Sequence, residues 1–93
     1  MEKNEHYFYV LQCADKSYYA GYTNNIAKRI DAHNAGKGAK YTRYRTPVHL
    51  IYQEQYSTKR AAMQAEYRFK QLTRKQKEIY IKEGLWNGAM DTV

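Results

Sequence analysis

Two short runs rich in aromatic residues, separated by four turn-forming residues, constrain the fold of this chain most strongly. Residues 7–13, Tyr-Phe-Tyr-Val-Leu-Gln-Cys, are aromatic and aliphatic, and residues 18–23 form a second run of this kind, as is typical of strands. The intervening Ala-Asp-Lys-Ser predicts a turn. We therefore expect an antiparallel hairpin whose first strand directs Tyr9 to one face and Phe8 to the other.

A helix, a basic loop and a third strand are expected after the hairpin. Asn24 or Asn25 can cap the helix, and Gly36 suits the left-handed conformation that ends it. Residues 36–47 are basic and contain glycine, which indicates a loop, and residues 48–56 indicate a strand.

Two further helices follow. Apolar residues recur at helical spacing over 59–72, and Thr73, followed three residues later by a glutamine, predicts a capped helix that runs to Glu83. A chain of 93 residues has room for one compact domain. We expect a single domain over 1–93, with its core in residues 6–83 and a C-terminal tail over 84–93.

The charge and the cysteine usage restrict the partners and the compartment. A formal net charge of +7 points to a polyanion, because clustered lysines and arginines displace counterions from phosphates. Charge alone does not separate nucleic-acid function from incidental binding. The single cysteine and the lack of zinc-ligand spacing are typical of a reducing compartment. With no signal peptide and no long apolar run, we expect a cytoplasmic protein that does not bind a membrane.

Glu66 is the most informative single residue. It falls within the apolar stripe of its predicted helix, one turn after Ala62 and three residues before Phe69. A carboxylate in such a stripe is costly unless something compensates it. Two interpretations are open: an edge position where Glu66 reaches solvent or pairs with a lysine or arginine, and a metal ligand at the floor of a cleft.

Other candidates for chemistry lie on the first predicted helix and the hairpin. Arg29 and His33 are four residues apart and share a helix face. A guanidinium suits a phosphate oxygen, and an imidazole can relay a proton, although a solvated helix face would carry the same pair. Tyr9 and Tyr19 lie in the predicted strands, where tyrosines are commonly part of the core.

The predicted basic loop interleaves positive charge with aromatic faces. Such a loop can follow a phosphate backbone and stack on an unpaired base. The alternative is a solvated loop whose tyrosines pack onto the sheet. The candidate nucleic-acid-binding residues are Lys37, Lys40, Tyr41, Arg43 and Arg45, with Tyr44 beside them.

In their order and spacing, these residues resemble the GIY-YIG nucleases. That family carries a tyrosine in the first strand, Tyr-x-Gly in the second, an arginine on the next helix, often with a histidine one turn later, and a glutamate on a later helix. The resemblance is greatest to small bacterial proteins that consist of this domain alone, and the chain is also similar to the nuclease domain of structure-selective endonucleases. The corresponding stretches are 7–11 (Tyr-Phe-Tyr-Val-Leu), 19–21 (Tyr-Ala-Gly), 28–34 (Lys-Arg-Ile-Asp-Ala-His-Asn) and 62–66 (Ala-Met-Gln-Ala-Glu).

Two positions depart from the family pattern. Tyr7 stands where the first motif has glycine, and Ala20 stands where the second has isoleucine or valine. Neither change removes a proposed catalytic group. The bulk of Tyr7 bears on substrate choice more than on chemistry.

The resemblance implies a fold and a function. The fold is an α/β domain with a small three-stranded antiparallel sheet flanked by helices, in the order β-β-α-β-α-α. The function is that of a hydrolase, a DNA endonuclease acting on phosphodiester bonds, with branched, nicked or irregular DNA as candidate substrates and DNA repair as a candidate process. A protein partner would help target it. The alternative is a nucleic-acid-binding module of the same fold that has lost efficient catalysis.

The resemblance also implies residue roles. Glu66 binds one Mg²⁺ or Mn²⁺, and Arg29 steadies the scissile phosphate. Tyr9, Tyr19 and His33 position or deprotonate the attacking water, on one face of the sheet. A tyrosine with a pKa near 10 is a poor base at neutral pH, so we expect Arg29 and the metal to lower its pKa. Tyr9 is the preferred candidate for the base, without excluding the others.

Overall fold

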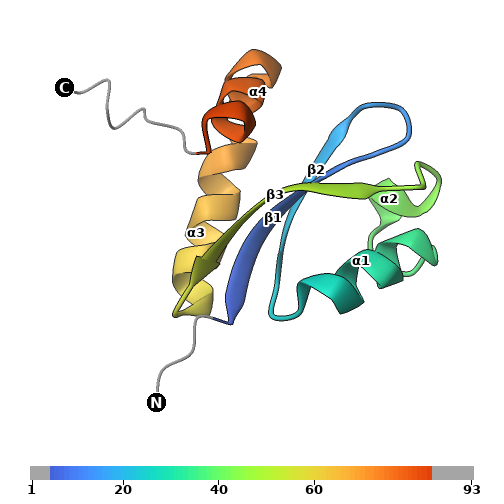
Figure 1. Cartoon of the computed structure of the whole chain (residues 1–93), viewed down its shortest axis with the longest axis horizontal. Coiled ribbons are helices and arrows are strands. Elements are labelled where there is room, and N and C mark those ends of the chain that lie inside the picture. Colours follow the sequence, from blue (N-terminus) through green and yellow to red (C-terminus); the bar gives the residue numbers. More distant parts are fainter. Residues whose placement is uncertain (1–4, 85–93) are drawn as a thin grey trace.

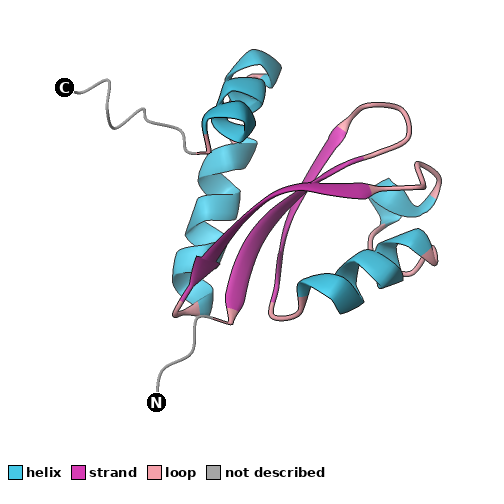
Figure 2. Cartoon of the chain, viewed as in Figure 1, coloured by secondary structure: helices cyan, strands magenta, loops and turns pink. Residues whose placement is uncertain are grey.

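The structure, a computed structural model, describes residues 5–84. The predicted tail from residue 85 onward lies outside the described residues. The described part contains three strands and four helices (Figures 1 and 2). In chain order they are β1 (His6–Gln12), β2 (Tyr18–Thr23), α1 (Ile26–Asn34), α2 (Lys40–Arg43), β3 (His49–Tyr56), α3 (Lys59–Lys70) and α4 (Arg74–Glu83).

The three strands form one antiparallel sheet in the order β2-β1-β3. Tyr9 in the central strand pairs with Gly21 in β2 and with Gln53 in β3. Helices α3 and α4 lie on one side of the sheet, and α1 and α2 lie on the other (Figure 1). The predicted α/β fold with a small three-stranded sheet is confirmed.

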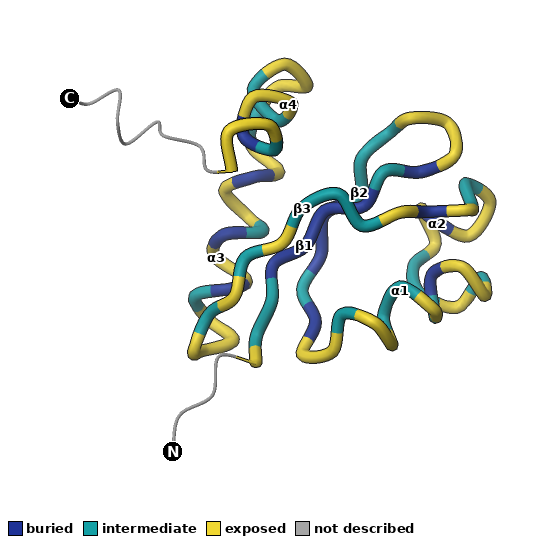
Figure 3. The backbone as a smooth tube through the Cα atoms, viewed as in Figure 1, coloured by how far each residue is buried: buried dark blue, intermediate teal, exposed yellow. Residues whose placement is uncertain are grey.

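The alternation along β1 produces a separate apolar core on each face. Phe8 and Val10 pack with Phe69 of α3 and Tyr80 of α4. The opposite face carries a second core, made of Tyr9, Leu11, Cys13 and Val48 with Ile26 and Ile30 of α1 packed against it. Both faces of β1 are therefore covered, and Figure 3 shows this strand buried along most of its length.

Caps confirm the predicted end of α1 and start of α4, whereas α3 ends at Lys70, two residues before the predicted end. The Asn25 side chain accepts a hydrogen bond from the backbone of Lys28 at the start of α1, and Gly36 follows that helix with a φ of +80°. Thr73 and Gln76 form a capping box at the start of α4. Within the described residues no helix has the length and hydropathy required of a membrane span.

One element is missing from the prediction. Helix α2 lies inside the segment 36–47 that we expected to be a loop. A single helical turn has no repeating apolar stripe, so periodicity cannot detect it. It is held instead by a tertiary contact, since Thr42 is fully buried and its Oγ1 lies 2.8 Å from Nδ1 of His33 on α1.

Asn34 fastens the end of α1 to the sheet. Its amide accepts from the backbone nitrogen of Val48 at 2.8 Å and donates to the carbonyl of the same residue at 3.2 Å. The side chain therefore satisfies both backbone groups of Val48, as a neighbouring strand would. This fixes α1 beside the start of β3.

Candidate active site

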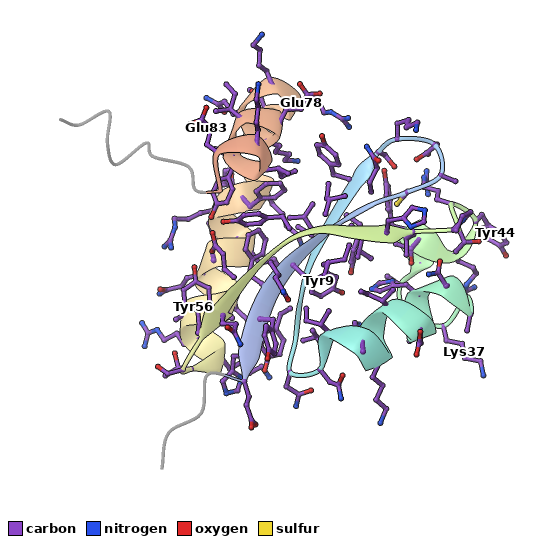
Figure 4. All side chains as sticks on the ribbon, viewed as in Figure 1. Tyr9, Lys37, Tyr44, Tyr56, Glu78 and Glu83 are labelled. Atoms are coloured by element: carbon purple, nitrogen blue, oxygen red, sulfur yellow. The ribbon has the colours of Figure 1, made fainter. Side chains whose placement is uncertain are left out.

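Tyr9 is the centre of the candidate site. It is 1% exposed and projects from the central strand towards α1 (Figure 4). Its cross-strand neighbour is Gly21, where a Cβ atom would lie 2.6 Å from the Tyr9 hydroxyl. The glycine of the second motif is thus required for space, because the phenol occupies the volume that a side chain would need.

His33 is held between three elements. It is fully buried, and its Nε2 lies 2.8 Å from the Tyr9 hydroxyl. Its Nδ1 lies 2.8 Å from Oγ1 of Thr42. A Cβ atom on Gly38 would lie only 2.4 Å from Nδ1, so the backbone of Gly38 packs directly on the ring. A solvated helix face, the alternative for this position, is excluded for His33.

Thr42 and Gly38 were both missed by the sequence reasoning. Each lies in a stretch whose lysines and arginines dominated its interpretation. A threonine or a glycine in a basic loop carries no local signal of burial. Only the tertiary packing shows that both contact His33.

Arg29 lies one turn before His33 on α1 and is half-buried. Its Nη2 reaches the Gly38 carbonyl at 3.5 Å, the outer limit of a hydrogen bond. Its Nε is buried and has no partner within residues 5–84. A buried guanidinium donor without a partner is costly, so Arg29 is available to an incoming anion.

The electrostatics keep His33 neutral and Tyr9 protonated. Burial, and then the positive charge of Arg29, lower the pKa of His33. Burial raises the pKa of Tyr9 to about 12, and Arg29 opposes this shift while Tyr19 and Glu66 add to it. Arg29 by itself therefore does not lower the pKa of Tyr9, because desolvation of the phenol outweighs the nearby guanidinium.

Glu66 belongs to the other layer of the molecule. Helix α3 packs on the face of the sheet opposite to Tyr9. The Glu66 side chain is 17% exposed, and its Oε2 accepts from Lys70 Nζ at 2.6 Å. The Glu66 carboxylate is therefore partly buried and paired with a lysine. Its charge still acts on the Tyr9 hydroxyl.

The expectation that all five residues share one face of the sheet thus needs correction. Tyr9, Tyr19, Arg29 and His33 lie on the α1 side, and Glu66 comes from the α3 side. The two sides meet at β2, which is an edge strand of the sheet. The reason is the alternation of side chains across β2, since Tyr19 faces α1 while Ala20 faces α3.

A groove of about 260 Å³ crosses this edge. Tyr19 and Tyr41 contribute from the α1 and α2 side, where their rings stack with centroids 6.1 Å apart. Lys70 and Lys77 contribute from the other side. The groove is lined by Tyr18, Tyr19, Ala20, Tyr41, Phe69, Lys70 and Lys77. It therefore offers aromatic faces and two cations next to the candidate catalytic residues.

A larger hollow on the outer face of α3 contains none of the predicted site residues. It measures about 820 Å³ and is lined by Lys59, Arg60, Met63, Gln64, Tyr67 and Arg68. The smaller groove is the better candidate site, because it borders Tyr19 and the Lys70 partner of Glu66. Arg29 lines a separate hollow of about 300 Å³.

The predicted nucleic-acid-binding residues separate into two groups. Tyr41 joins the site, and Lys40 and Arg43 are exposed beside it on α2. Lys37 points away from the labelled Tyr9 in Figure 4. Arg45 is occupied, since its Nη1 donates to the Tyr41 carbonyl at 2.6 Å and its Nε donates to Asp15 at 3.1 Å.

The donor set restricts which metal ion the site could hold. Within residues 5–84, no three histidine, cysteine or carboxylate side chains gather as a ligand group. Glu66 offers a carboxylate beside the site, and its Oε2 is engaged by Lys70. One carboxylate fits Mg²⁺, which keeps several waters when protein-bound, and does not fit a closed site such as structural zinc.

Comparisons with known proteins agree with this geometry. Residues 5–79 match the model of the GIY-YIG catalytic domain. The chain belongs to the GIY-YIG family. The family's two named motifs correspond to the segments that bring Tyr9 and Gly21 into contact. One relative, the UPF0213 protein YazA of Bacillus subtilis, is 65% identical over 83 residues, which cover 89% of this chain and 84% of YazA.

Two solved structures share the GIY-YIG fold seen here. A UPF0213 protein from Bacillus halodurans is 41% identical with a TM-score of 0.57, covering 95% of this chain and 93% of that one. A protein from E. faecalis is 52% identical with a TM-score of 0.60, covering 89% and 90%. Both were solved by solution NMR. The predicted membership of a small bacterial branch is confirmed.

Proposed function

We propose that this protein is a metal-dependent DNA endonuclease that hydrolyses phosphodiester bonds. The observation that carries the proposal is the buried hydrogen bond between Tyr9 and His33, 2.8 Å long, beside a guanidinium with an unused donor. Family membership supports a nuclease.

Arg29 binds the scissile phosphate in this proposal. Its Nε lacks a partner within the described residues, and a guanidinium suits the geometry of phosphate oxygens. Lys70 and Lys77 extend the positive charge along the groove. The DNA backbone would thus follow the edge of β2.

Tyr9 and His33 accept the proton of the attacking water. As the water oxygen bonds to phosphorus, its proton passes to the Tyr9 oxygen, and the Tyr9 proton passes to Nε2 of His33. The bond from phosphorus to one bridging oxygen breaks, and that oxygen leaves and is protonated by solvent. The lowered pKa of His33 keeps its imidazole neutral and able to accept at pH 7. Tyr19, which lines the groove, would position the substrate.

Glu66 would hold a single Mg²⁺ or Mn²⁺. Waters and phosphate oxygens would complete the coordination, and the ion would stabilise the negative charge that develops at phosphorus. Lys70 now occupies one Glu66 oxygen, and its half-exposed side chain can turn into the groove. Lys70 would then leave Glu66 and contact the DNA.

Branched, nicked or irregular DNA is the proposed substrate class. Tyr41 is exposed at the groove, and an unpaired base would stack on its ring in place of the Arg45 guanidinium, which now covers one face. Irregular DNA exposes bases of this kind, whereas an intact duplex does not. A role in DNA repair in the cytoplasm, with a protein partner for targeting, would follow from that preference.

The test is cleavage of duplex, nicked, flap and branched DNA with Mg²⁺ or Mn²⁺ added or chelated. Replacing Glu66 by glutamine should lower kcat by about 100-fold or more, because it removes the carboxylate that holds the ion. Glu78→Gln is the matched control. Like Glu66, Glu78 forms an ion pair with a basic residue four positions away on its helix, here Arg74 at 3.0 Å. Glu78 does not line the groove.

Cleavage that survives chelation, or that Glu66→Gln leaves intact, would contradict the metal-dependent mechanism. Intact substrates under every condition, together with tight and salt-sensitive binding, would favour the alternative of a binding module without catalysis. In that case Lys40→Ala or Arg43→Ala should weaken binding.

A further inference from the structure

Thr42 completes a chain of hydrogen bonds beneath the site. It is fully buried on α2. Its Oγ1 lies 2.8 Å from Nδ1 of His33 and 3.1 Å from the carbonyl oxygen of Ala39. Beyond the histidine, Nε2 lies 2.8 Å from the Tyr9 hydroxyl. The four groups therefore form one continuous line from the Ala39 carbonyl to the Tyr9 phenol.

We propose that Thr42 is a positioning residue: its hydroxyl holds His33 in the tautomer that carries its proton on Nδ1. In that arrangement the Ala39 carbonyl accepts from Thr42, Thr42 accepts from His33 Nδ1, and Nε2 accepts from Tyr9. Each of the three protons in the chain then has an acceptor.

The other tautomer leaves one proton without a partner. With the proton on Nε2, His33 would donate to the Tyr9 oxygen, and Thr42 would donate to Nδ1. The Tyr9 proton would then lose its acceptor on His33, and Thr42 would give up its bond to the Ala39 carbonyl. A buried hydroxyl without an acceptor is costly, so the network favours the first tautomer.

The packing around the His33 ring prevents it from rotating away from these two partners. Gly38 lies against the ring on its Nδ1 side, where a Cβ atom would come within 2.5 Å of Cγ. The Tyr19 ring contacts it edge-on, with centroids 5.1 Å apart. Both ring nitrogens therefore stay directed at their partners.

The consequence for catalysis rests on the proposed function. Only the tautomer with a free Nε2 can take the proton of Tyr9 when the phenol takes one from water. Thr42 would thus act on the reaction through His33, without touching the DNA.

The tautomer can be measured without DNA or metal. Two-bond ¹H–¹⁵N correlation spectra of ¹⁵N-labelled protein distinguish a protonated from an unprotonated ring nitrogen. We expect a protonated Nδ1 and a bare Nε2 for His33 in the wild type and in Thr42→Ser. Thr42→Val keeps the shape but removes the acceptor of the Nδ1 proton. The proton should then move to Nε2, because the Tyr9 hydroxyl can rotate to another acceptor whereas a ring N–H cannot.

Two further variants complete this test. Tyr9→Phe should keep the proton on Nδ1, because Thr42 is still present. Thr23→Val is the matched control, since Thr23 is another buried threonine, whose hydroxyl bonds the Asn25 backbone at 3.1 and 3.2 Å. It should leave the tautomer unchanged. A proton on Nε2 in the wild type or in Tyr9→Phe, or an unchanged tautomer in folded Thr42→Val, would overturn the proposal.

Cleavage provides a second readout. Thr42→Val should lower kcat by about 10- to 100-fold, the size of effect expected for a residue that orients a functional histidine, and Thr42→Ser should restore it. If the wild type cuts no DNA, the proposed function fails while the tautomer measurements still decide the role of Thr42. If Thr42→Val moves the proton but cleaves normally, the catalytic part of the inference is wrong.

Discussion

His33 couples the protonation of the site to the stability of the fold. The side chain is fully buried, and its neutral form bonds both Tyr9 and Thr42. Burial and the charge of Arg29 lower its pKa from the ordinary value of 6.5. The folded protein therefore binds fewer protons at His33 than the unfolded chain does at mildly acidic pH. Its contribution to stability is present above pH 6.5 and is lost as the pH falls.

We expect the free energy of unfolding to decrease between pH 7.5 and pH 5, with a slope from His33 of up to about 1.4 kcal/mol per pH unit. Urea unfolding of the wild type and of His33→Gln at several pH values measures this. The glutamine variant should be less stable at pH 7.5 but should lose less stability on acidification. Equal slopes for the two proteins would show that folding does not lower the pKa of His33.

At the scale of the element, α2 is fastened to the hairpin turn as well as to α1. The backbone carbonyl of Arg45 accepts from Ala14 at 2.8 Å, and its side chain bonds Asp15. The guanidinium also lies 4.0 Å from the centroid of the Tyr41 ring. Arg45 therefore holds in place the helix that carries Tyr41 and Thr42.

Arg45→Gln should lower the free energy of unfolding by about 1 kcal/mol, since exposed ion pairs contribute little. It should also lower kcat, because α2 would be less firmly placed. Arg43→Gln, the neighbouring change of equal charge, should leave stability unchanged and weaken DNA binding. Chemical denaturation and binding titrations separate the two effects. If Arg45→Gln weakened binding without any loss of stability, Arg45 would be a DNA contact, as its position in a basic segment first suggested.

At the scale of the whole molecule, the site is built where two layers meet at a sheet edge. On the side of the sheet that α1 and α2 cover lie the phenols, the imidazole and one guanidinium. On the other side, α3 and α4 supply the carboxylate and two lysines. The net charge of +7 supplies attraction for DNA. In the proposed function, the groove would determine which of the cations lie beside the DNA backbone.

Lys77→Ala should therefore reduce the slope of log K against log salt by about one, because it removes one phosphate contact. Lys82→Ala is the control, since Lys82 is exposed on the same helix and does not line the groove. Binding is measured without metal, so that no substrate is cut. Equal reductions of the slope in both variants would place the DNA elsewhere on the surface.

Local patterns were sufficient for the elements of this fold. The alternation in residues 7–13 placed Tyr9 and Phe8 on opposite faces, and capping residues located the ends of α1 and α4. These features depend on neighbours in the chain. Local patterns failed to predict α2, because a helix of four residues is too short to show a repeating apolar pattern and is held by the burial of Thr42.

The site residues illustrate what a sequence determines alone. Residue type and order identified Tyr9, Arg29, His33 and Glu66 as candidates, because their chemistry is local to each side chain. The tertiary structure decided how they meet. It buried Tyr9 deeply enough to raise its pKa, placed Glu66 across the sheet edge, and brought Thr42 onto His33. Desolvation and hydrogen-bond partners depend on residues distant in the chain, so only the folded packing could set them.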